Sequence, residues 1–340
     1  MAATALSAAA GERSEIMRGA VRARWGAPKD VVEIGEVTKP KLEDDTVLVR
    51  VKAVSVNRAD YYMVKAPGIL LRPMIGGFLK PKTRQIGTDF AGVVEAVGAN
   101  VTGYQHGDEV FGAKTPAFGE FVAARMFVHK PANVSFEEAA SVPVSALTAL
   151  QGLRDHGKLQ PGQSVLVNGA SGAVGTFAVQ IAKALGAGTV TAVCSPRNVE
   201  QAHALGADRV MDYTKEDFTR TGDRYDVILD IGGTQPWRKL RRALQPDGTV
   251  VTVGSQKRGS ALIGPLGYIG RVWLASRFTR QKAVFFIAKF NESDMEALRE
   301  LLESGKVKPV IERVYPFAQI ADALQYMGEG HARAKLVITL

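Results

Sequence analysis

A glycine-rich stretch at 170–175 has the residue types and the spacing that suit the binding of a pyrophosphate. It reads Ala170-Ser171-Gly172-Ala173-Val174-Gly175 and directly follows the β-branched run at 165–167. Small residues after a strand allow a tight turn, a close approach of phosphate and close packing of the next helix. That helix would offer unpaired N–H groups and the positive end of its dipole, so we predict cofactor contacts from Ser171 to Val174. Ala170 stands where glycine usually begins such a fingerprint, and an ordinary glycine turn is the alternative interpretation.

A second candidate cluster lies where the next strand is expected to end, at 193–198. A dinucleotide site that prefers NAD usually has Asp or Glu here to hold the ribose 2′-hydroxyl. This stretch has no acid and offers Ser195 and Arg197 instead. Because a guanidinium binds phosphate in a bidentate geometry, we predict a 2′-phosphate pocket and NADPH as the cofactor. The alternative interpretation is a solvent-exposed basic loop.

The elements expected around these clusters alternate between strand and helix from Val142 onward. Apolar residues after the glycine-rich stretch have the spacing of a buried helix face, and Gly186 ends that helix. The expected strands are 164–168, 190–194, 209–212, 226–231 and 249–254, with helices that include 198–205 and 236–244. This alternation predicts an α/β fold with a doubly wound parallel sheet. The strand ends at Ile231, Gly254 and Ser255 would then face the cofactor.

The preceding part of the chain, 18–135, has the pattern of short strands separated by glycine and proline. This pattern predicts a β-rich domain. Its strand candidates are 46–54, 90–97 and 119–123. Near the other end, Ser293 and Glu296 have the spacing of a capping box before an apolar helix. A last strand at 335–340 is expected to return to the β-rich domain.

Composition and charge are those of a globular protein with two domains. The chain has 340 residues, is 46% hydrophobic and 23% charged, and lacks an uncharged apolar run of the ~18 residues that a membrane helix needs. The net charge of +9 comes from 43 basic and 34 acidic residues spread along the chain. No nucleic-acid partner is expected, because the basic stretches lack aromatic residues at the spacing of a nucleic-acid-binding module. The aromatic and basic segment 263–287 leaves contact with a membrane surface as a minor alternative.

Cysteine content and the first residues bear on the cellular setting. The single cysteine, Cys194, allows neither a disulfide within the chain nor a metal site built from several cysteines. This favours a reducing, cytoplasmic setting. Residues 1–17 lack the basic start and the long apolar core of a signal peptide. We expect them to form a disordered extension.

Taken together, these stretches resemble the medium-chain dehydrogenase/reductase superfamily, in particular its zinc-independent, quinone-oxidoreductase-like branch. The motifs that carry the resemblance include SVNRADYYM at 55–63, GTDFAGVVEAVGANV at 87–101, AASVPVSALTALQGL at 139–153, NGASGAVGTFAVQIAKALGA at 168–187, FFIAKFN at 285–291 and HARAKLVITL at 331–340. The resemblance implies a GroES-like substrate domain over 18–140 and 290–340, a Rossmann NADP(H)-binding domain over 141–289, and a cleft between them. We also expect a homodimer.

The resemblance further implies which residues surround the cofactor. They are Asn57 and Thr148 at the nicotinamide, Ser195, Arg197 and Tyr213 at the adenosine 2′-phosphate, and Phe286, Ile287 and Arg333 elsewhere along the cofactor. A turn-forming role for Asn57, an ordinary helix position for Thr148 and a packing role for Tyr213 remain as alternatives.

The resemblance also bears on metals. Zinc-dependent members of the superfamily hold their catalytic metal with a Cys, a His and a third Cys or Asp. The matching positions in this sequence are Asn57, Thr88 and, approximately, Val144. Neither threonine nor valine is a useful zinc ligand, so no metal is expected.

These expectations combine into one function, the NADPH-dependent reduction of quinones or α,β-unsaturated carbonyls. Hydride addition to an electrophilic acceptor needs no metal, whereas alcohol oxidation usually relies on one. Asn57, Tyr61 and Tyr62 are the candidate catalytic residues, since a tyrosine hydroxyl can donate a hydrogen bond to the developing enolate. The alternative is that both tyrosines only line an apolar pocket. A second class of function stays open, a non-enzymatic NADPH-binding protein that acts in scaffolding, nucleic-acid contact or membrane-surface contact.

Overall fold

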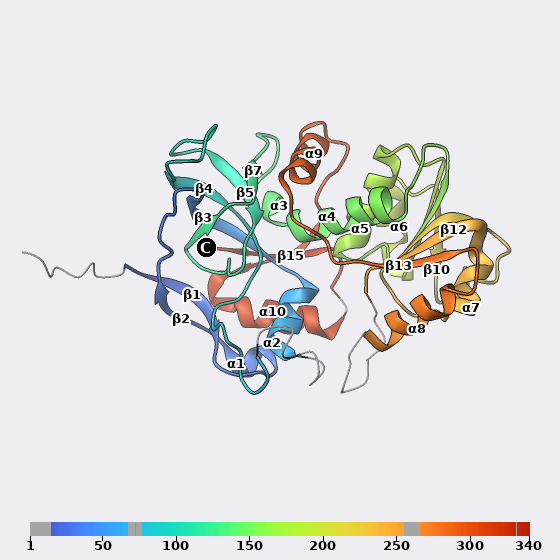
Figure 1. Cartoon of the computed structure of the whole chain (residues 1–340), viewed down its shortest axis with the longest axis horizontal. Coiled ribbons are helices and arrows are strands. Elements are labelled where there is room, and N and C mark those ends of the chain that lie inside the picture. The colour runs from blue at the N-terminus through green and yellow to red at the C-terminus, as the bar shows by residue number, and fades with distance from the viewer. Residues whose placement is uncertain (1–14, 67–71, 73–76, 255–265, 331) are drawn as a thin grey trace, which may run out of the picture.

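The computed structural model of the chain describes residues 15–66, 72, 77–254, 266–330 and 332–340. Two large β-sheets lie side by side along its longest axis, and helices α4 (Pro143–Gln151) and α9 (Glu292–Glu303) stand between them (Figure 1). Ser255, a predicted cofactor contact, and residues 1–14 of the expected extension lie outside the described residues.

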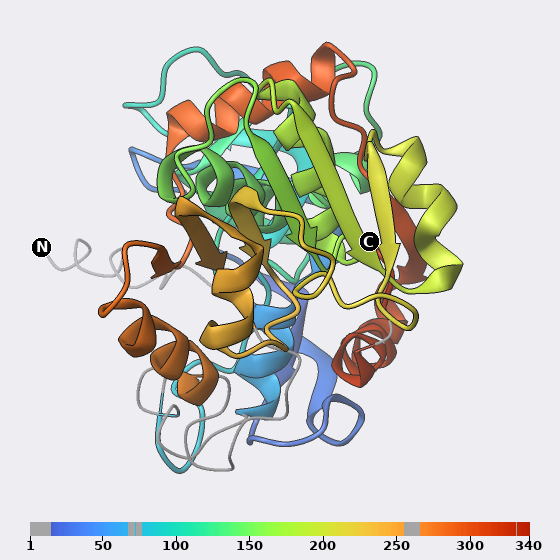
Figure 2. The same cartoon turned by 90° about the vertical axis from the view of Figure 1, so that its right-hand side faces the viewer.

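The sheet that carries the glycine-rich stretch is parallel throughout and has six strands. These are β8 (Ser164–Asn168), β9 (Thr189–Cys194), β10 (Arg209–Asp212), β11 (Tyr225–Asp230), β12 (Leu244–Thr252) and β13 (Lys282–Phe285). Their order in the sheet is β10-β9-β8-β11-β12-β13, and Figure 2 shows the strands side by side. The chain adds strands on one side of β8 up to β10 and then crosses to add β11 to β13 on the other side, so the strand order reverses between β8 and β11. Ligands of such sheets bind outside the carboxyl ends of the strands at this reversal. The predicted doubly wound sheet is confirmed.

Helical segments connect these strands. They are α4, a π-helical turn at Gly152–His156, α5 (Ala173–Ala184), a 3₁₀ turn at Pro196–Asn198, α6 (Val199–Ala204), α7 (Trp237–Leu240), a 3₁₀ turn at Arg241–Ala243 and α8 (Leu266–Ser276). Gly186 has a φ of +82° just after α5, so it ends the helix as predicted. The helix expected at 236–244 is shorter, because Leu244 already pairs with Tyr225 as the first residue of β12.

The second large sheet has seven strands and is mostly antiparallel. They are β3 (Val47–Val56), β4 (Asp89–Val97), β5 (Glu109–Ala113), β6 (Phe121–Ala124), β7 (Phe127–His129), β14 (Ile311–Pro316) and β15 (Lys335–Thr339). A separate pair is formed by β1 (Ile16–Arg22) and β2 (Val32–Thr38), and the helical segments of this part are α1 (Pro28–Val31), α2 (Arg58–Lys65), α3 (Phe136–Ala140), a 3₁₀ turn at Phe317–Gln319 and α10 (Ile320–Glu329). The last strand, β15, pairs with β3, so its predicted return to the β-rich part is confirmed.

Two local predictions need correction. Strand β1 begins at Ile16, so the last two residues of the expected extension pair with β2. The helix after 290 begins earlier than the capping-box pattern of Ser293 indicated. Its N-cap is Asn291, whose side chain accepts a hydrogen bond from the N–H of Asp294 at 2.9 Å. Ser293 lies inside the first turn and donates to the side-chain oxygen of Asn291 instead.

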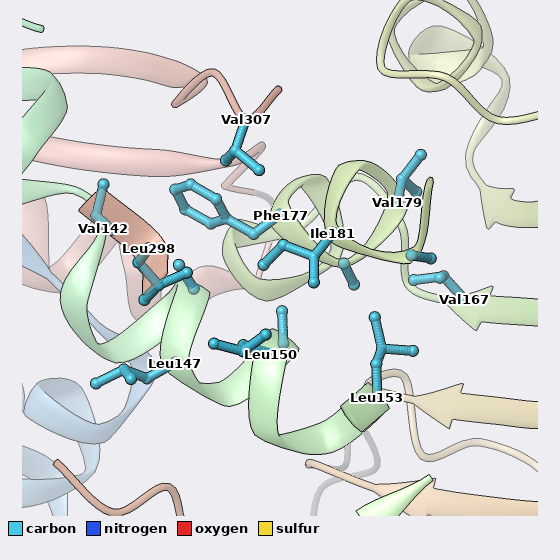
Figure 3. Packing of buried hydrophobic residues seen from close by; sticks show 14 of the residues in the cluster. Val142, Leu147, Leu150, Leu153, Val167, Phe177, Val179, Ile181, Leu298 and Val307 are labelled. Carbon is cyan, nitrogen blue, oxygen red and sulfur yellow. The ribbon is translucent and has the colours of Figure 1, made fainter. Parts of the chain in front are cut away.

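One hydrophobic core continues from sheet to sheet around α4. Figure 3 labels several members of this core: Leu147, Leu150, Leu153, Val167, Phe177, Ile181 and Leu298. The same cluster contains Phe111 from β5, on the side of the seven-stranded sheet. Along α4 the partly exposed positions are Val144 and Thr148, one turn apart on one side of the helix. The other residues of α4 are buried and fix the helix in place. We call Val144 and Thr148 the uncovered stripe of α4.

Candidate active site

The glycine-rich turn between β8 and α5 leaves room over its backbone. Gly169 carries the left-handed conformation, with a φ of +97°, which explains why Ala170 is tolerated at the next position. A Cβ atom at Gly175 would lie 2.2 Å from the carbonyl oxygen of Gly169, so α5 packs directly on the turn. At Gly172, which caps α5, a Cβ atom would meet its nearest neighbour at 3.6 Å. The first N–H groups of α5 therefore adjoin an open surface, as a pyrophosphate site requires.

The segment before β15 runs along this turn. The N–H of Ala334 donates to the carbonyl oxygen of Ser171 at 2.8 Å, and Gly172 and Ala334 form an isolated parallel bridge. This contact brings Arg333 to the predicted pyrophosphate site. The Arg333 guanidinium lies 3.7 Å from the carboxylate of Glu312. Ala334 has a φ of +56°, a left-handed conformation that favours glycine.

The residues predicted at the 2′-phosphate gather at the ends of β9 and β10. Arg197 and Tyr213 are exposed and Ser195 is partly exposed. The N–H of Tyr213 donates to the carbonyl oxygen of Cys194 at 3.2 Å, which joins the two strand ends. A carboxylate that sequence reasoning passed over, Asp212, pairs with Cys194 in the strand register. Hydrogen bonds from the side chain and backbone of Thr214 hold it and lower its pKa.

At the reversal between β8 and β11, a buried carboxyl group holds the strand ends together. Asp230 is 0% exposed and accepts hydrogen bonds from the side chain of Asn168 at 2.7 Å and from the N–H of Gly233 at 3.0 Å. The hydroxyl of Tyr268, on α8, donates to its other oxygen at 2.8 Å. Burial raises the pKa of Asp230 despite these bonds. The adjacent Ile231, a predicted cofactor contact, is partly exposed at this edge.

The remaining predicted contacts of the Rossmann part differ in their surroundings. Gly254 is partly exposed just after β12. Phe286 stacks on His156, with ring centroids 4.2 Å apart. Ile287 is 78% exposed. The sequence motif alone gave no reason to expect the aromatic contact of Phe286.

A buried polar cluster centred on Asp89 lies beside the uncovered stripe of α4. One Asp89 oxygen accepts from the Ser55 hydroxyl and the Asn57 amide, both at 2.9 Å, and the other accepts from the N–H of Val144 at 3.1 Å. The Lys335 ammonium lies 3.3 Å from Asp89 and donates to the Asn57 amide oxygen at 2.8 Å. Asp89 and Lys335 are both fully buried. This cluster ties β3, β4, α4 and β15 together, and sequence reasoning found neither Asp89 nor Lys335.

Burial has a clear electrostatic consequence in this cluster. It lowers the pKa of Lys335, while the carboxylate of Asp89 opposes that change. A buried ion pair of this kind is costly to break from one side, because the remaining charge has no partner. The side chain of Asn57 is hydrogen-bonded to both charged groups: its oxygen accepts from Lys335, and its NH₂ group donates to Asp89.

Thr148 and the two tyrosines occupy different environments. Thr148 is partly exposed, and its hydroxyl donates to the carbonyl oxygen of Val144 at 2.6 Å. Tyr61 packs so closely on α10 that a Cβ atom at Gly328 would lie 2.2 Å from its ring. Burial raises the pKa of Tyr61. Tyr62 is partly exposed, and its ring centroid is 5.9 Å from that of Tyr61.

The three positions that match zinc ligands lie around Asp89. Asn57 is hydrogen-bonded to Asp89 and Lys335. The Thr88 hydroxyl donates to the carboxyl of Asp60 at 3.0 Å. Val144 contributes only a backbone N–H. In the part of the chain that the structure describes, no three His, Cys, Asp or Glu side chains are grouped as metal ligands. Nor does any described helix combine the length and the apolar character needed to span a bilayer.

Comparison with known proteins shows similarity along most of the chain. Two family models match, "Alcohol dehydrogenase GroES-like domain" over residues 43–150 and "Zinc-binding dehydrogenase" over 205–338. The 2-methylene-furan-3-one reductase of Solanum lycopersicum is 32% identical in an alignment that covers 91% of this chain and 76% of the relative. The chloroplastic NADPH-dependent alkenal/one oxidoreductase of Arabidopsis thaliana is 30% identical over the same shares of the two chains. The solved quinone oxidoreductase of Coxiella burnetii is 27% identical and has a TM-score of 0.83, with 96% of this chain and 100% of that chain covered.

Proposed function

We propose, since the chain belongs to the quinone-oxidoreductase-like branch of the medium-chain dehydrogenase/reductase superfamily, that it is a reductase that uses NADPH and no zinc. Its proposed substrates are quinones or α,β-unsaturated carbonyls. The observation that carries the proposal is the chemistry at the three positions that match zinc ligands. An ammonium and a carboxylate already engage the Asn57 side chain, a carboxyl engages the Thr88 hydroxyl, and Val144 offers an alkyl group. This donor set suits hydrogen bonding rather than metal binding.

The residues present fit a nicotinamide dinucleotide. The open surface over Gly172 adjoins the N-terminus of α5, a helix of 12 residues, where backbone N–H groups would hold the pyrophosphate. Ser171, Ala173 and Val174 would contribute to the same cradle. Ser195, Arg197 and Tyr213 would surround the 2′-phosphate, because they share one exposed edge and a guanidinium suits a phosphate. A relative named as NADPH-dependent supports this choice of cofactor.

The chain's own residues would then orient the reactants. When bound, the reduced nicotinamide supplies a hydride. Thr148 keeps an oxygen lone pair free to accept from a carboxamide, because its hydroxyl hydrogen points to Val144. Asn57 would act mainly by holding Asp89 and Lys335 in place, which is a narrower role than a direct cofactor contact. The remaining contacts that we propose are Ile231, Gly254, Phe286, Ile287 and Arg333.

Tyr62 is the better of the two tyrosine candidates for a hydrogen bond to the reduced acceptor. Both tyrosines are partly exposed, but the ring of Tyr61 is packed against α10. The acceptor would need little beyond orientation and a donor to its oxyanion, because its own π-system takes up the hydride.

We further propose the assembly and setting expected from the sequence. Strand β13 ends the order of the six-stranded sheet, so one of its edges has no partner among the described strands and could pair with a second copy. Light scattering would test the homodimer. A cytoplasmic setting and the domain boundaries at 140 and 290 also remain proposals. A relative is named as chloroplastic, so the cellular location of this protein would be tested by subcellular fractionation.

A panel of acceptors tests the proposed function. Purified, metal-free protein is mixed with NADPH and a benzoquinone, a 2-alkenal or an alkenone, and the loss of NADPH absorbance is followed. Turnover of at least one acceptor class supports the proposal. NADPH binding without turnover of any acceptor would favour the non-enzymatic alternative.

A further inference from the structure

We propose that the Thr88 hydroxyl delivers the proton that completes the reduction and that the buried Asp60 carboxyl supplies this proton to Thr88. The inference rests on the proposed function and names the proton donor of that reaction. It is carried by a line of hydrogen-bonding groups that leads from the buried Asp60 through Thr88 to the exposed Thr115.

Asp60 is held at the inner end of this line. It lies in the first turn of α2 and is 0% exposed. One of its oxygens accepts from the N–H of Asn57 at 2.8 Å, and the other is 3.0 Å from the Thr88 hydroxyl oxygen. Across this distance Thr88 donates to an ionised Asp60, and a protonated Asp60 can donate to Thr88. A proton can leave Asp60 through the bond to Thr88, since the Asn57 N–H is a donor that holds its own hydrogen.

Thr88 joins this buried carboxyl to the surface. Its side chain is partly exposed, and its hydroxyl oxygen is 3.5 Å from the hydroxyl oxygen of the exposed Thr115. A hydroxyl both accepts and donates, so Thr88 can take a proton from Asp60 on one side and give one up on the other. Asp89, the next residue, accepts from the N–H of Val144 at 3.1 Å, so the backbone of Thr88 lies near the start of α4, beside which the nicotinamide is proposed to lie.

The charges of the cluster favour a protonated Asp60. Asp89 from β4 and Lys335 from β15 are the charged groups that act on it, and Lys335 pairs with Asp89. Two carboxylates and one ammonium would leave a net negative charge in a buried region, whereas protonation of Asp60 leaves a neutral set. In agreement, burial and the charge of Asp89 raise the pKa of Asp60 to about 7.

The step balances as a proton relay. The hydride electron pair enters the acceptor and leaves an enolate or a quinol anion. The O–H bond of Thr88 breaks toward that anion as the O–H bond of Asp60 breaks toward Thr88. Asp60 is left as a carboxylate and regains its proton from water through the same hydroxyls. An enolate needs this proton more than a quinol anion does, because the quinol anion is the weaker base.

The test compares variants that differ by one group. Thr88→Val removes the hydroxyl at constant shape, Thr88→Ser retains it, and Asp60→Asn keeps an oxygen acceptor without a transferable proton. Thr102→Val, at an exposed loop position, is the control. With an alkenone and saturating NADPH, kcat is measured from pH 5 to 9 for each variant. In parallel, the carboxyl signals of ¹³C-aspartate-labelled protein without cofactor are titrated, and Asp60→Asn identifies the Asp60 signal.

We expect kcat of the wild type to fall as the pH rises through about 7, because Asp60 then loses its proton. Thr88→Val and Asp60→Asn should lower kcat by roughly 10²-fold, the usual share of general acid catalysis, and should abolish this pH dependence. Thr88→Ser should restore both, and the Asp60 signal should titrate near pH 7. A wild type that turns over while Thr88→Val keeps its rate and pH profile would overturn only this inference, as would an Asp60 signal that titrates below pH 5. A wild type without any turnover would overturn the proposed function as well.

Discussion

At the scale of single residues, Lys335 gives the sharpest stability prediction. It is fully buried against Asp89, so Lys335→Met should leave an unpaired carboxylate in the interior and cost about 3–5 kcal/mol. The double variant Lys335→Met with Asp89→Asn should recover most of this loss, because it removes both charges. Urea unfolding of the two variants measures the difference. Equal losses in both would show that packing, rather than charge, dominates at Lys335.

Asp60 predicts a pH dependence of stability. Its folded-state pKa is raised to about 7 from 3.8, so between these values the folded protein holds a proton that the unfolded chain has released. The free energy of unfolding should therefore fall as the pH rises from about 4 to 7, by ~2–4 kcal/mol relative to Asp60→Asn. Urea unfolding of wild type and variant at pH 5 and pH 8 checks this. Parallel pH profiles of the two proteins would contradict it.

Arg197 predicts cofactor preference. A charged hydrogen bond contributes about 1.5–3 kcal/mol, and the exposure of Arg197 favours the lower end. Arg197→Ala should thus weaken NADPH binding roughly 10-fold and leave NADH binding unchanged. Arg220→Ala, exposed on the same part of the chain, is the control. Fluorescence titration with both cofactors measures the effect, and an equal loss for NADH would remove Arg197 from the 2′-phosphate pocket.

At the scale of elements, Ala334 carries a detectable strain. Its φ of +56° costs an L-residue about 1–2 kcal/mol, and the added freedom of glycine in the unfolded chain offsets part of the gain. Ala334→Gly should raise stability by roughly 0.5–1 kcal/mol. Ala321→Gly, inside helix α10, is the control and should lower stability, because its backbone is helical and glycine there gains nothing. Thermal unfolding of both variants without cofactor distinguishes them, and a lower melting temperature for Ala334→Gly would contradict the strain.

Sequence reasoning found the parallel strands closely and the helix limits less well. The runs at 164–168 and 209–212 coincide with β8 and β10, because each has apolar residues at its centre and polar or charged residues at its ends. Residues 236–244 looked helical locally, yet pairing with β11 turned Leu244 into strand. Strands β1, β2, β5, β7, β13 and β14 were not predicted individually, because several are short and their side chains contact partners far away in the sequence.

At the scale of the whole molecule, the site depends on contacts that no local pattern reveals. Lys335 and Asp89 are far apart in the sequence and meet only because β15 returns to β3 beside β4. The same return places Ala334 on the glycine-rich turn of the other sheet. The cofactor motif was readable because it is contiguous, whereas the buried cluster and the Asp60–Thr88 pair required the assembled fold.

The reaction of the metal-free protein, followed through NADPH, separates zinc-independent reduction from zinc-dependent alcohol oxidation. Protein treated with a chelator and analysed for zinc is given NADPH with a benzoquinone, a 2-alkenal or an alkenone, and NADP⁺ with primary and secondary alcohols. We expect oxidation of NADPH by a quinone or an enone at a rate that the chelator leaves unchanged, and little reduction of NADP⁺ by alcohols. Alcohol oxidation that is lost with one tightly bound zinc per chain, without turnover of any quinone or enone, would contradict it.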